Sequence, residues 1–373
     1  MREQTVVFLL RFRHQINPGV TPQGDLALRL GVMGVPRDCD KMGRQDDILK
    51  GLQDWAGQFY GSGATVERLV RLSGGASQET WSLDVEHSGI VDELILRRVP
   101  GGVSVARNSE AIDLGTEAKL LGCAEHTVPT PKVLKVFDPS SEIGEAFLMN
   151  RIAGQTIARK ILRDDVYENA RQCLTAQCGK ALSGIHAIPI EQLPTLPKSG
   201  GLDQLAKYET IYRGFDIPRP VFELTMAWLK KNQPQPVDPV LVHGDFRLGN
   251  LIVNEHGLAA VLDWELAHLG DPREDIAWLC VNSWRFGQSQ NRVGGFGHLN
   301  ELLDAYEASG GQNFAADQID WWEILGSFKW GIMCMIMYEA FRSGSDPSVE
   351  RAAIGRRVSE TEIDLLNLLE TRA

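Results

Sequence analysis

The chain has 373 residues, 43% of them hydrophobic, and a formal net charge of −11, which suggests two domains or one two-lobed unit with a substantial core. The acidic balance argues against nucleic-acid binding, and no apolar run approaches the ~20 residues needed to span a bilayer, so neither nucleic acid nor membrane is expected as a partner. The six cysteines form no C-x-x-C pair, which favours reduced thiols in a cytoplasmic protein.

The first 44 residues differ in character from the rest of the chain, because proline, glycine and charged residues interrupt every periodic run. We therefore predict that residues 1–44 form a poorly ordered extension, followed by an N-terminal lobe at 45–152 and a C-terminal lobe at 153–373. Within residues 46–60, apolar side chains recur at steps of three and four, which predicts an amphipathic helix. These side chains are Ile48, Leu52, Trp55 and Phe59.

Three strands are predicted at residues 65–72, 79–85 and 93–99 from their apolar and β-branched runs. The first two flank the sequence Ser-Gly-Gly-Ala-Ser. The backbone N–H groups of Gly74, Gly75 and Ser77 at this hairpin tip can cap the phosphates of a nucleotide. An ordinary glycine-containing turn is the alternative interpretation.

Two arginines stand at the end of the third strand. Strand alternation puts Arg97 and Arg98 on opposite faces of the sheet, so only one of them can face a cleft between lobes. We interpret Arg98 as a solvated charge. A helix with Glu117 and two more strands come next, at residues 110–123, 133–137 and 146–152, and the last strand leads into Ala153-Gly154 as the hinge between lobes.

Beyond the hinge the apolar pattern turns helical. One predicted helix carries a group of aromatic side chains, for which core packing and lining of an acceptor pocket are both possible roles: Trp321, Trp322, Phe328 and Trp330. The helices are predicted at residues 164–187, 201–212, 220–231, 274–284, 299–308, 318–341 and 349–370.

Residues 241–279 carry the side chains that indicate chemistry. Asp245 follows a short apolar run, and Asn250 comes five residues later. Two β-type runs around the turn signal at 254–257 predict a hairpin that can bring Asp263 back beside Asn250. Carboxylate and amide oxygens are ligands that Mg²⁺ prefers, so the arrangement suits phosphoryl transfer, although Asp and Asn also favour ordinary turns.

The sequence Asp-Pro-Arg-Glu at residues 271–274 matches a helix-capping box, with Asp271 at the N-cap and Glu274 reaching back to it. We therefore interpret Asp271 as the start of a helix. Asp275, the next residue, is interpreted as a structural group that braces the loop of Asp245 rather than as a metal ligand.

The ordered set of motifs in this segment resembles the aminoglycoside phosphotransferase and choline kinase-like family. The resemblance extends over residues 47–368 and is closest to the kinase-like domain found on some acyl-CoA dehydrogenases. It implies an α+β, two-lobed protein-kinase-like fold, with a small antiparallel β-sheet N-lobe and a mainly helical C-lobe. The motifs are His243-Gly244-Asp245, Asn250, Leu262-Asp263-Trp264-Glu265 and Gly270-Asp271-Pro272 with Asp275.

The resemblance also implies a reaction, in which ATP or GTP with Mg²⁺ gives its γ-phosphate to a hydroxyl group of a small molecule. Asp245 would accept or orient the hydroxyl proton, and Asn250 and Asp263 would bind Mg²⁺. Arg247 stands where protein kinases often carry a lysine that contacts the transferring phosphoryl group. The family label suggests an aminoglycoside acceptor, whereas the dehydrogenase branch suggests a hydroxyacyl thioester or another metabolite.

Nucleotide contacts in the N-terminal lobe are implied by the same resemblance. Arg97 takes the place of the strand lysine that holds phosphates in kinases, and Glu117 would brace it. Backbone groups between Met149 and Arg151 would meet the edge of the adenine ring.

Two other functions are compatible with these residues. The missing lysine supports a nucleotide-binding pseudokinase that regulates a partner, whereas the intact set of Asp245, Asn250 and Asp263 argues against it. A metal-dependent hydrolase would use His243, Asp245 and Asp263. The histidines are too scattered for that function, and oxygen ligands favour Mg²⁺ over Zn²⁺.

Overall fold

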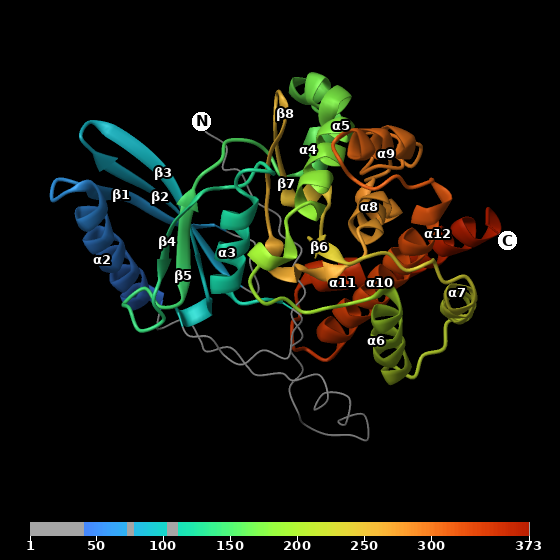
Figure 1. The fold of residues 1–373 in the computed structure, drawn as a ribbon. Helices are drawn as coiled ribbons and strands as arrows, with labels where there is room; N and C mark the ends of the chain where they lie inside the picture. Colours follow the sequence, from blue (N-terminus) through green and yellow to red (C-terminus); the bar gives the residue numbers. More distant parts are fainter. Residues whose placement is uncertain (1–40, 73–77, 103–110, 373) are drawn as a thin grey trace.

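The computed structural model describes residues 41–72, 78–102 and 111–372 (Figure 1). Residues 1–40 of the predicted extension lie outside the described residues. The same holds for Gly74, Gly75 and Ser77, which were predicted to cap nucleotide phosphates.

The N-terminal part is built on a 5-stranded sheet in the order β1-β2-β3-β5-β4. Every neighbouring pair of strands is antiparallel, as predicted for a small N-terminal lobe. The strands begin and end close to the predicted positions, because each contains the apolar run from which it was inferred. They are β1 (Thr65–Leu72), β2 (Glu79–His87), β3 (Ile90–Arg98), β4 (Val133–Phe137) and β5 (Ala146–Asn150).

Helix α2 (Lys41–Tyr60) covers the outer face of this sheet (Figure 1). Alternation along β3 turns Leu94 and Leu96 to the same side as Ile48 and Leu52, and these residues share one core. The predicted helix is present, but Phe59 does not belong to its buried face. Phe59 is 55% exposed and stacks on Trp55, with 5.2 Å between ring centroids, while Ala56 is fully buried.

Helix α3 (Leu114–Ala124) covers the inner face and lies between the sheet and the C-terminal helices (Figure 1). It begins later than predicted because Asp113 caps it, accepting a hydrogen bond from the Thr116 amide at 2.8 Å. Phe147 and Met149 on β5 belong to a second core, which contains α3 residues and continues into the C-terminal part. The two lobes are therefore joined by buried apolar side chains.

The C-terminal part is mainly helical and is arranged around α10 (Asp317–Arg342), which contacts α6, α7, α8, α11 and α12. The helix predicted at 349–370 is two helices, because the chain turns after Gly355. Gly355 packs closely against α10, since an added Cβ atom would lie 2.7 Å from Tyr338 Cβ. The remaining helices are α4 (Ala158–Arg163), α5 (Glu168–His186), α6 (Gly201–Gly214), α7 (Pro220–Lys231), α8 (Arg273–Cys280), α9 (Leu299–Ala308), α11 (Val349–Gly355) and α12 (Val358–Glu370).

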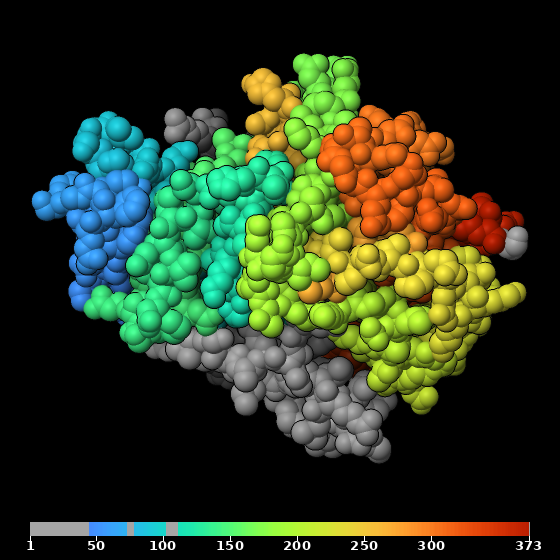
Figure 2. All heavy atoms as spheres, in the orientation of Figure 1, coloured from blue at the N-terminus to red at the C-terminus, as the bar shows by residue number. Residues whose placement is uncertain are grey.

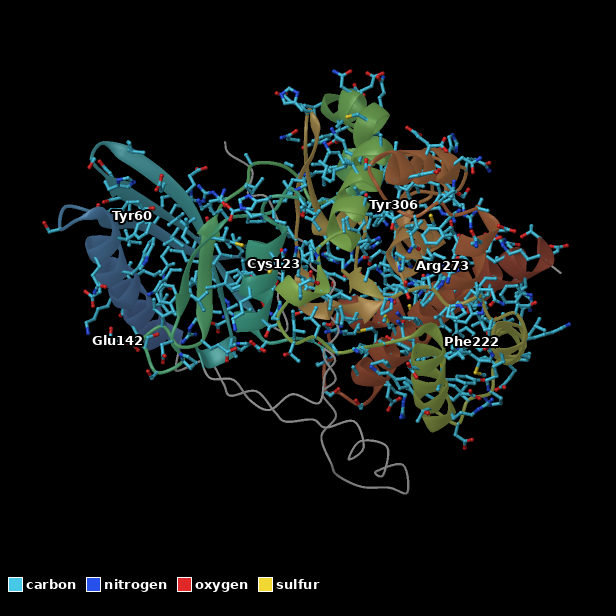
Figure 3. All side chains as sticks on the ribbon, in the orientation of Figure 1. Tyr60, Cys123, Glu142, Phe222, Arg273 and Tyr306 are labelled. Carbon is cyan, nitrogen blue, oxygen red and sulfur yellow. The ribbon has the colours of Figure 1, made fainter. Side chains whose placement is uncertain are left out.

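The aromatic residues of α10 pack in the core rather than at an exposed pocket. Trp321 and Trp322 are 4% exposed, and Phe328 and Trp330 are fully buried. Phe222 of α7, labelled in Figure 3, packs against α10, with 5.5 Å between its ring centroid and that of Phe328. Helix α10 is long and apolar enough to cross a membrane, but 78% of its apolar stretch is buried, as for a core helix. Figure 2 shows the N-terminal and C-terminal parts packed side by side.

Candidate active site

The predicted hairpin is present and brings the polar residues of segment 241–279 together. Strands β7 (Leu251–Asn254) and β8 (Gly257–Val261) pair antiparallel around a tight turn. The Leu262 amide donates to the Asn250 carbonyl at 2.8 Å, so the returning chain carries Asp263 beside Asn250. Asp263 has a left-handed backbone conformation, with φ 68° and ψ 62°, which turns the chain sharply after β8.

Asp245 lies in the loop after β6 (Val240–Val242), a strand paired with β9 (His268–Gly270). Its side chain is nearly buried, and N–H groups hold both carboxylate oxygens. Oδ1 accepts from Arg247 Nε at 3.0 Å and from Trp278 Nε1 at 2.6 Å, and Oδ2 accepts from Asn250 Nδ2 at 2.7 Å. The carboxylate is therefore fixed in one orientation.

Buried hydrogen bonds stabilise the loop that carries Asp245. Asp275 accepts from the His243 amide at 2.7 Å and from the Gly244 amide at 2.9 Å, which confirms its predicted structural role. The His243 ring accepts from the Asp245 amide at Nδ1, at 3.2 Å, and its Nε2 is 3.0 Å from the Leu262 carbonyl. Because both ring nitrogens have backbone partners, His243 is not available as a metal ligand.

Gly244 explains why this loop departs from the kinase pattern His-Arg-Asp. Its φ is +81°, a region that favours glycine, and an added Cβ would lie 2.5 Å from the Leu266 carbonyl oxygen. A side chain at this position would collide with backbone rather than with a mobile side chain. The close approach keeps the Asp245 loop against the segment after Asp263.

Asn250 provides a test of whether the site suits Mg²⁺. Its Nδ2 group donates to the carboxylate and to the carbonyl of Asp245, at 2.7 Å and 2.9 Å. Its Oδ1 atom is buried and has no hydrogen-bond partner among the described residues. A buried oxygen without a donor is costly unless a ligand satisfies it, and an amide oxygen is a type of ligand atom that Mg²⁺ takes.

Arg97 connects the sheet to this loop. It lies on the inner face of β3 and is 4% exposed, and its Nη2 is 3.1 Å from Glu117 Oε1 and 3.4 Å from Asp263 Oδ1. Gln78 Oε1 accepts from Arg97 Nε and Nη2, at 3.0 Å and 2.6 Å. The structure thus brings Arg97, Glu117 and Asp263 together, and adds Gln78, which the sequence analysis missed although it comes directly after the Gly- and Ser-rich tip.

The prediction that Arg98 is a solvated charge is wrong. Arg98 is 5% exposed on the outer face of β3, where its Nη1 is 2.8 Å from Glu79 Oε2 and its Nε donates to the Ile143 carbonyl. A buried arginine needs such partners, and neither partner is adjacent to it in sequence. The expected assignment of opposite faces to Arg97 and Arg98 is confirmed.

The predicted hinge groups are partly used within the sheet. Met149 is buried in the second core. The Arg151 amide donates to the Glu93 carbonyl at 2.8 Å, and its guanidinium is 2.9 Å from Asp84. The next amide, that of Ile152, has no acceptor within the described ranges.

Glu274 does not form the predicted capping box with Asp271. Its carboxylate turns into the core, 2.7 Å from Gln204 Nε2, 3.1 Å from His268 Nε2 and 3.2 Å from Lys329 Nζ.

Burial alone would lower the pKa of His268, but the charge of Glu274 and the hydrogen bond to it raise that pKa to about 9. Burial would raise the pKa of Glu274, but Lys329 and His268 lower it to about 2. Helices α6 and α10 supply Gln204 and Lys329, so local sequence could not show this cluster.

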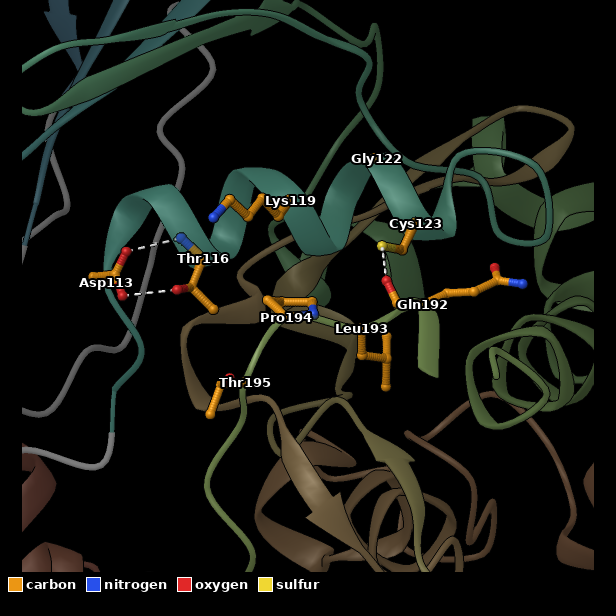
Figure 4. A pocket seen from close by; sticks show the side chains of 9 residues that line it. All are labelled: Asp113, Thr116, Lys119, Gly122, Cys123, Gln192, Leu193, Pro194 and Thr195. Atoms are coloured by element: carbon orange, nitrogen blue, oxygen red, sulfur yellow. Dashed lines mark hydrogen bonds between the residues drawn. The ribbon is translucent and has the colours of Figure 1, made fainter. Parts of the chain in front are cut away.

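A groove of about 720 Å³ lies away from these residues, between α3 and residues 192–195 (Figure 4). Within it, the Cys123 thiol donates to the Gln192 carbonyl at 3.2 Å and links α3 to the C-terminal part. None of the predicted site residues that the structure describes lines this groove. Its lining consists of Asp113, Thr116, Lys119, Gly122, Cys123, Gln192, Leu193, Pro194 and Thr195.

A model of the phosphotransferase enzyme family matches residues 68–314, which include Arg97, Asp245 and Asp263. The chain belongs to this phosphotransferase enzyme family, as its motifs predicted. Family membership supports a small-molecule phosphotransferase.

The curated relatives include acyl-CoA dehydrogenase family members and an aminoglycoside phosphotransferase. Acyl-CoA dehydrogenase family member 10 of Mus musculus is 30% identical over 221 residues, which are 57% of this chain and 20% of that protein. Aminoglycoside 3'-phosphotransferase of Escherichia coli is 25% identical over 258 residues, which are 65% of this chain and 83% of that protein. The chain thus spans only a small part of the dehydrogenase relative.

Solved structures share the fold. A choline/ethanolamine kinase family protein from Mesorhizobium loti is 18% identical, with a TM-score of 0.57 over 87% of this chain and 95% of that chain. A ternary complex of aminoglycoside phosphotransferase APH(4)-Ia with ADP and hygromycin B is 14% identical, with a TM-score of 0.53 over 87% of this chain and 99% of that chain. The predicted two-lobed kinase-like fold is confirmed.

Proposed function

We propose that this chain transfers the γ-phosphate of ATP or GTP, with Mg²⁺, to a hydroxyl group of a small molecule. One observation carries the proposal: the Asp245 carboxylate is held by N–H groups beside a buried amide oxygen of Asn250 that has no partner among the described residues. Kinases transfer a phosphoryl group to an alcohol with a carboxylate that accepts the hydroxyl proton and with oxygen ligands, among them an asparagine, that hold Mg²⁺.

Asp245 orients the acceptor hydroxyl and accepts its proton as the bond to phosphorus forms. The transition state of phosphoryl transfer is loose, so the carboxylate contributes by positioning as well as by basicity. Arg247 donates its Nε–H to Asp245 Oδ1 and is 3% exposed. Its guanidinium thereby stands beside the reacting groups, where it can bind an oxygen of the transferring phosphoryl group.

Asn250 and Asp263 are the residues that would hold Mg²⁺. The ion neutralises charge on the nucleotide phosphates when bound. Arg97 binds phosphate oxygens from the side of the sheet, with Glu117 and Gln78 fixing its guanidinium. Gly74, Gly75 and Ser77 remain the predicted caps of the terminal phosphates, and the Ile152 amide is the donor proposed for the edge of the nucleobase. The APH(4)-Ia structure, solved in complex with ADP, supports nucleotide binding by this fold.

The acceptor class is inferred from the relatives. We propose a hydroxylated acyl thioester or a related metabolite first, because acyl-CoA dehydrogenase family member 10 has the higher identity at 30%. An aminoglycoside is the second candidate, supported by the Escherichia coli relative at 25% identity. We also propose a cytoplasmic location, since the cysteines within the described residues all carry free thiols.

The two alternative functions have weaker support. A pseudokinase would be consistent with the loss of the usual lysine, but Arg97 keeps the cationic contacts to Glu117 and Asp263. A metal-dependent hydrolase would need His243, whose two ring nitrogens face backbone groups.

The test is a transfer assay with the purified chain. Mg·ATP and Mg·GTP are each offered with hydroxyacyl-CoA thioesters, other hydroxylated metabolites and aminoglycosides, while release of the nucleoside diphosphate is monitored. The product is identified by mass as the acceptor carrying one additional phosphoryl group. Binding of Mg·ATP without a phosphorylated product across the panel would favour the pseudokinase instead.

A further inference from the structure

The indole of Trp278 reaches the Asp245 carboxylate from α8. Its Nε1–H donates to Asp245 Oδ1 at 2.6 Å, and the side chain is 5% exposed. Oδ1 also accepts from Arg247 at 3.0 Å, whereas Oδ2 accepts from one described residue, Asn250, at 2.7 Å. Each carboxylate oxygen has two lone pairs, so Oδ1 is fully used and one lone pair of Oδ2 is left within the described surroundings.

Buried groups in turn hold the indole. Its ring centroid is 5.4 Å from that of Trp284 and 5.4 Å from Lys329 Nζ. Lys329 is fixed by Gln204 at 2.5 Å and by Glu274 at 3.2 Å. A cation near an aromatic ring is attracted by its π electrons, so the charged cluster behind Trp278 stabilises one position of its N–H group.

We propose that Trp278 is a positioning residue for Asp245, and that by occupying Oδ1 it directs the acceptor hydroxyl of the substrate to Oδ2. This inference rests on the proposed phosphotransferase function. In the step it describes, the hydroxyl proton passes to Oδ2, the hydroxyl oxygen bonds to the γ-phosphorus, and the bond from phosphorus to the nucleoside diphosphate breaks. Core packing alone would need an aromatic ring at this position but no N–H group.

Trp278→Phe separates these roles, because it keeps an aromatic ring and removes the donor. Trp321→Phe is the matched control. Trp321 is 4% exposed on α10, and its Nε1–H donates to the Leu229 carbonyl at 3.0 Å, so its replacement also deletes a buried indole hydrogen bond. The two variants differ in the acceptor that loses its donor, a carboxylate in one case and a backbone carbonyl in the other.

We expect Trp278→Phe to lower kcat by about 10- to 100-fold, the factor corresponding to a lost hydrogen bond to a charged group. The KM for the nucleotide should stay within about twofold, since Trp278 makes no described hydrogen bond to Arg97, the residue proposed to hold the phosphates. Trp321→Phe should leave kcat within about twofold. An unchanged kcat in Trp278→Phe, or an equal loss in both variants, overturns the proposal.

A second measurement does not depend on turnover. In ¹⁵N-tryptophan-labelled protein, the indole N–H signal that disappears in Trp278→Phe belongs to Trp278. Asp245→Asn should move this signal upfield, because a neutral acceptor replaces a charged one, and should leave the Trp321 signal in place. A Trp278 signal that does not move shows that the hydrogen bond to Asp245 is absent.

The two measurements distinguish the possible failures. If the wild-type chain phosphorylates no acceptor while the Trp278 signal responds to Asp245→Asn, the proposed function fails and the hydrogen bond stands. If the wild type is active and Trp278→Phe is equally active, the proposed function stands and the positioning role fails.

Discussion

Replacing Arg97 with methionine removes the one described side chain that joins β3 to both Glu117 and Asp263. Methionine keeps much of the length of arginine but donates no hydrogen bond. The two carboxylates, 1% and 4% exposed, then lose a guanidinium that lies 3.1 Å and 3.4 Å from them. Removing one partner of a buried ion pair typically costs about 3–5 kcal/mol, because a charge remains without compensation. We expect Arg97→Met to lower the free energy of unfolding by that amount.

Arg98→Met is the matched control, because Arg98 is 5% exposed and pairs with Glu79 at 2.8 Å on the opposite face of the same strand. It should destabilise the protein to a similar extent, by about 3–5 kcal/mol. Affinity for Mg·ATP should differ between the two variants. A charge-assisted hydrogen bond contributes about 1.5–3 kcal/mol, so Arg97→Met should raise the Kd for Mg·ATP by about 10- to 100-fold and Arg98→Met should not.

Urea denaturation gives the free energy of unfolding, and calorimetric titration with Mg·ATP gives the Kd. Arg97→Lys should recover part of the affinity, since lysine supplies a point charge without the planar fork of arginine. If Arg98→Met weakens nucleotide binding as much as Arg97→Met does, the loss is one of general stability. The account of Arg97 as the phosphate ligand would then be refuted.

Two further predictions concern the loops and helices around the site. Glu274 raises the pKa of His268 to about 9, although burial of His268 opposes this shift. The ion pair therefore contributes its full stabilisation below about pH 6.5, the ordinary pKa of histidine. Urea denaturation should therefore show a loss of about 3 kcal/mol as the pH rises through 9, and no such loss in His268→Gln. Gly244→Ala should cost about 3 kcal/mol or more, because a Cβ would lie 2.5 Å from the Leu266 carbonyl. Gly89→Ala, at a φ of +75° with open space around it, should cost only about 1–2 kcal/mol in the same assay.

Features encoded within a short stretch could be predicted from the sequence. Turn residues between two β-type runs define the hairpin of β7 and β8, and the same hairpin places Asp263 beside Asn250. Strand alternation was sufficient to separate the faces of Arg97 and Arg98. Asp275 could be assigned to the support of the Asp245 loop through its place in the motif.

Features that depend on packing between distant segments could not be predicted. Trp278 is 33 residues from Asp245, and nothing in its local pattern distinguishes an indole that donates to a carboxylate from one that fills the core. Glu274 fits a capping box by spacing, yet its carboxylate pairs with Lys329, which is 55 residues away on α10. Arg98 looked solvated because its partner Glu79 is 19 residues away in sequence, opposite it on the neighbouring strand β2.

The central claim is that Asp245 acts in the chemistry while Asn250 and Asp263 act through the metal ion. Asp245→Asn keeps the shape of the side chain and removes its charge and basicity. With an acceptor from the panel in hand, this variant should bind Mg·ATP with the wild-type Kd and transfer phosphate with kcat lower by about 10²–10⁴, the usual range for loss of a general base. Asp263→Ala, measured beside it, should weaken Mg·ATP binding as well as turnover. Wild-type turnover in Asp245→Asn would contradict the assignment of this site as a phosphotransferase centre.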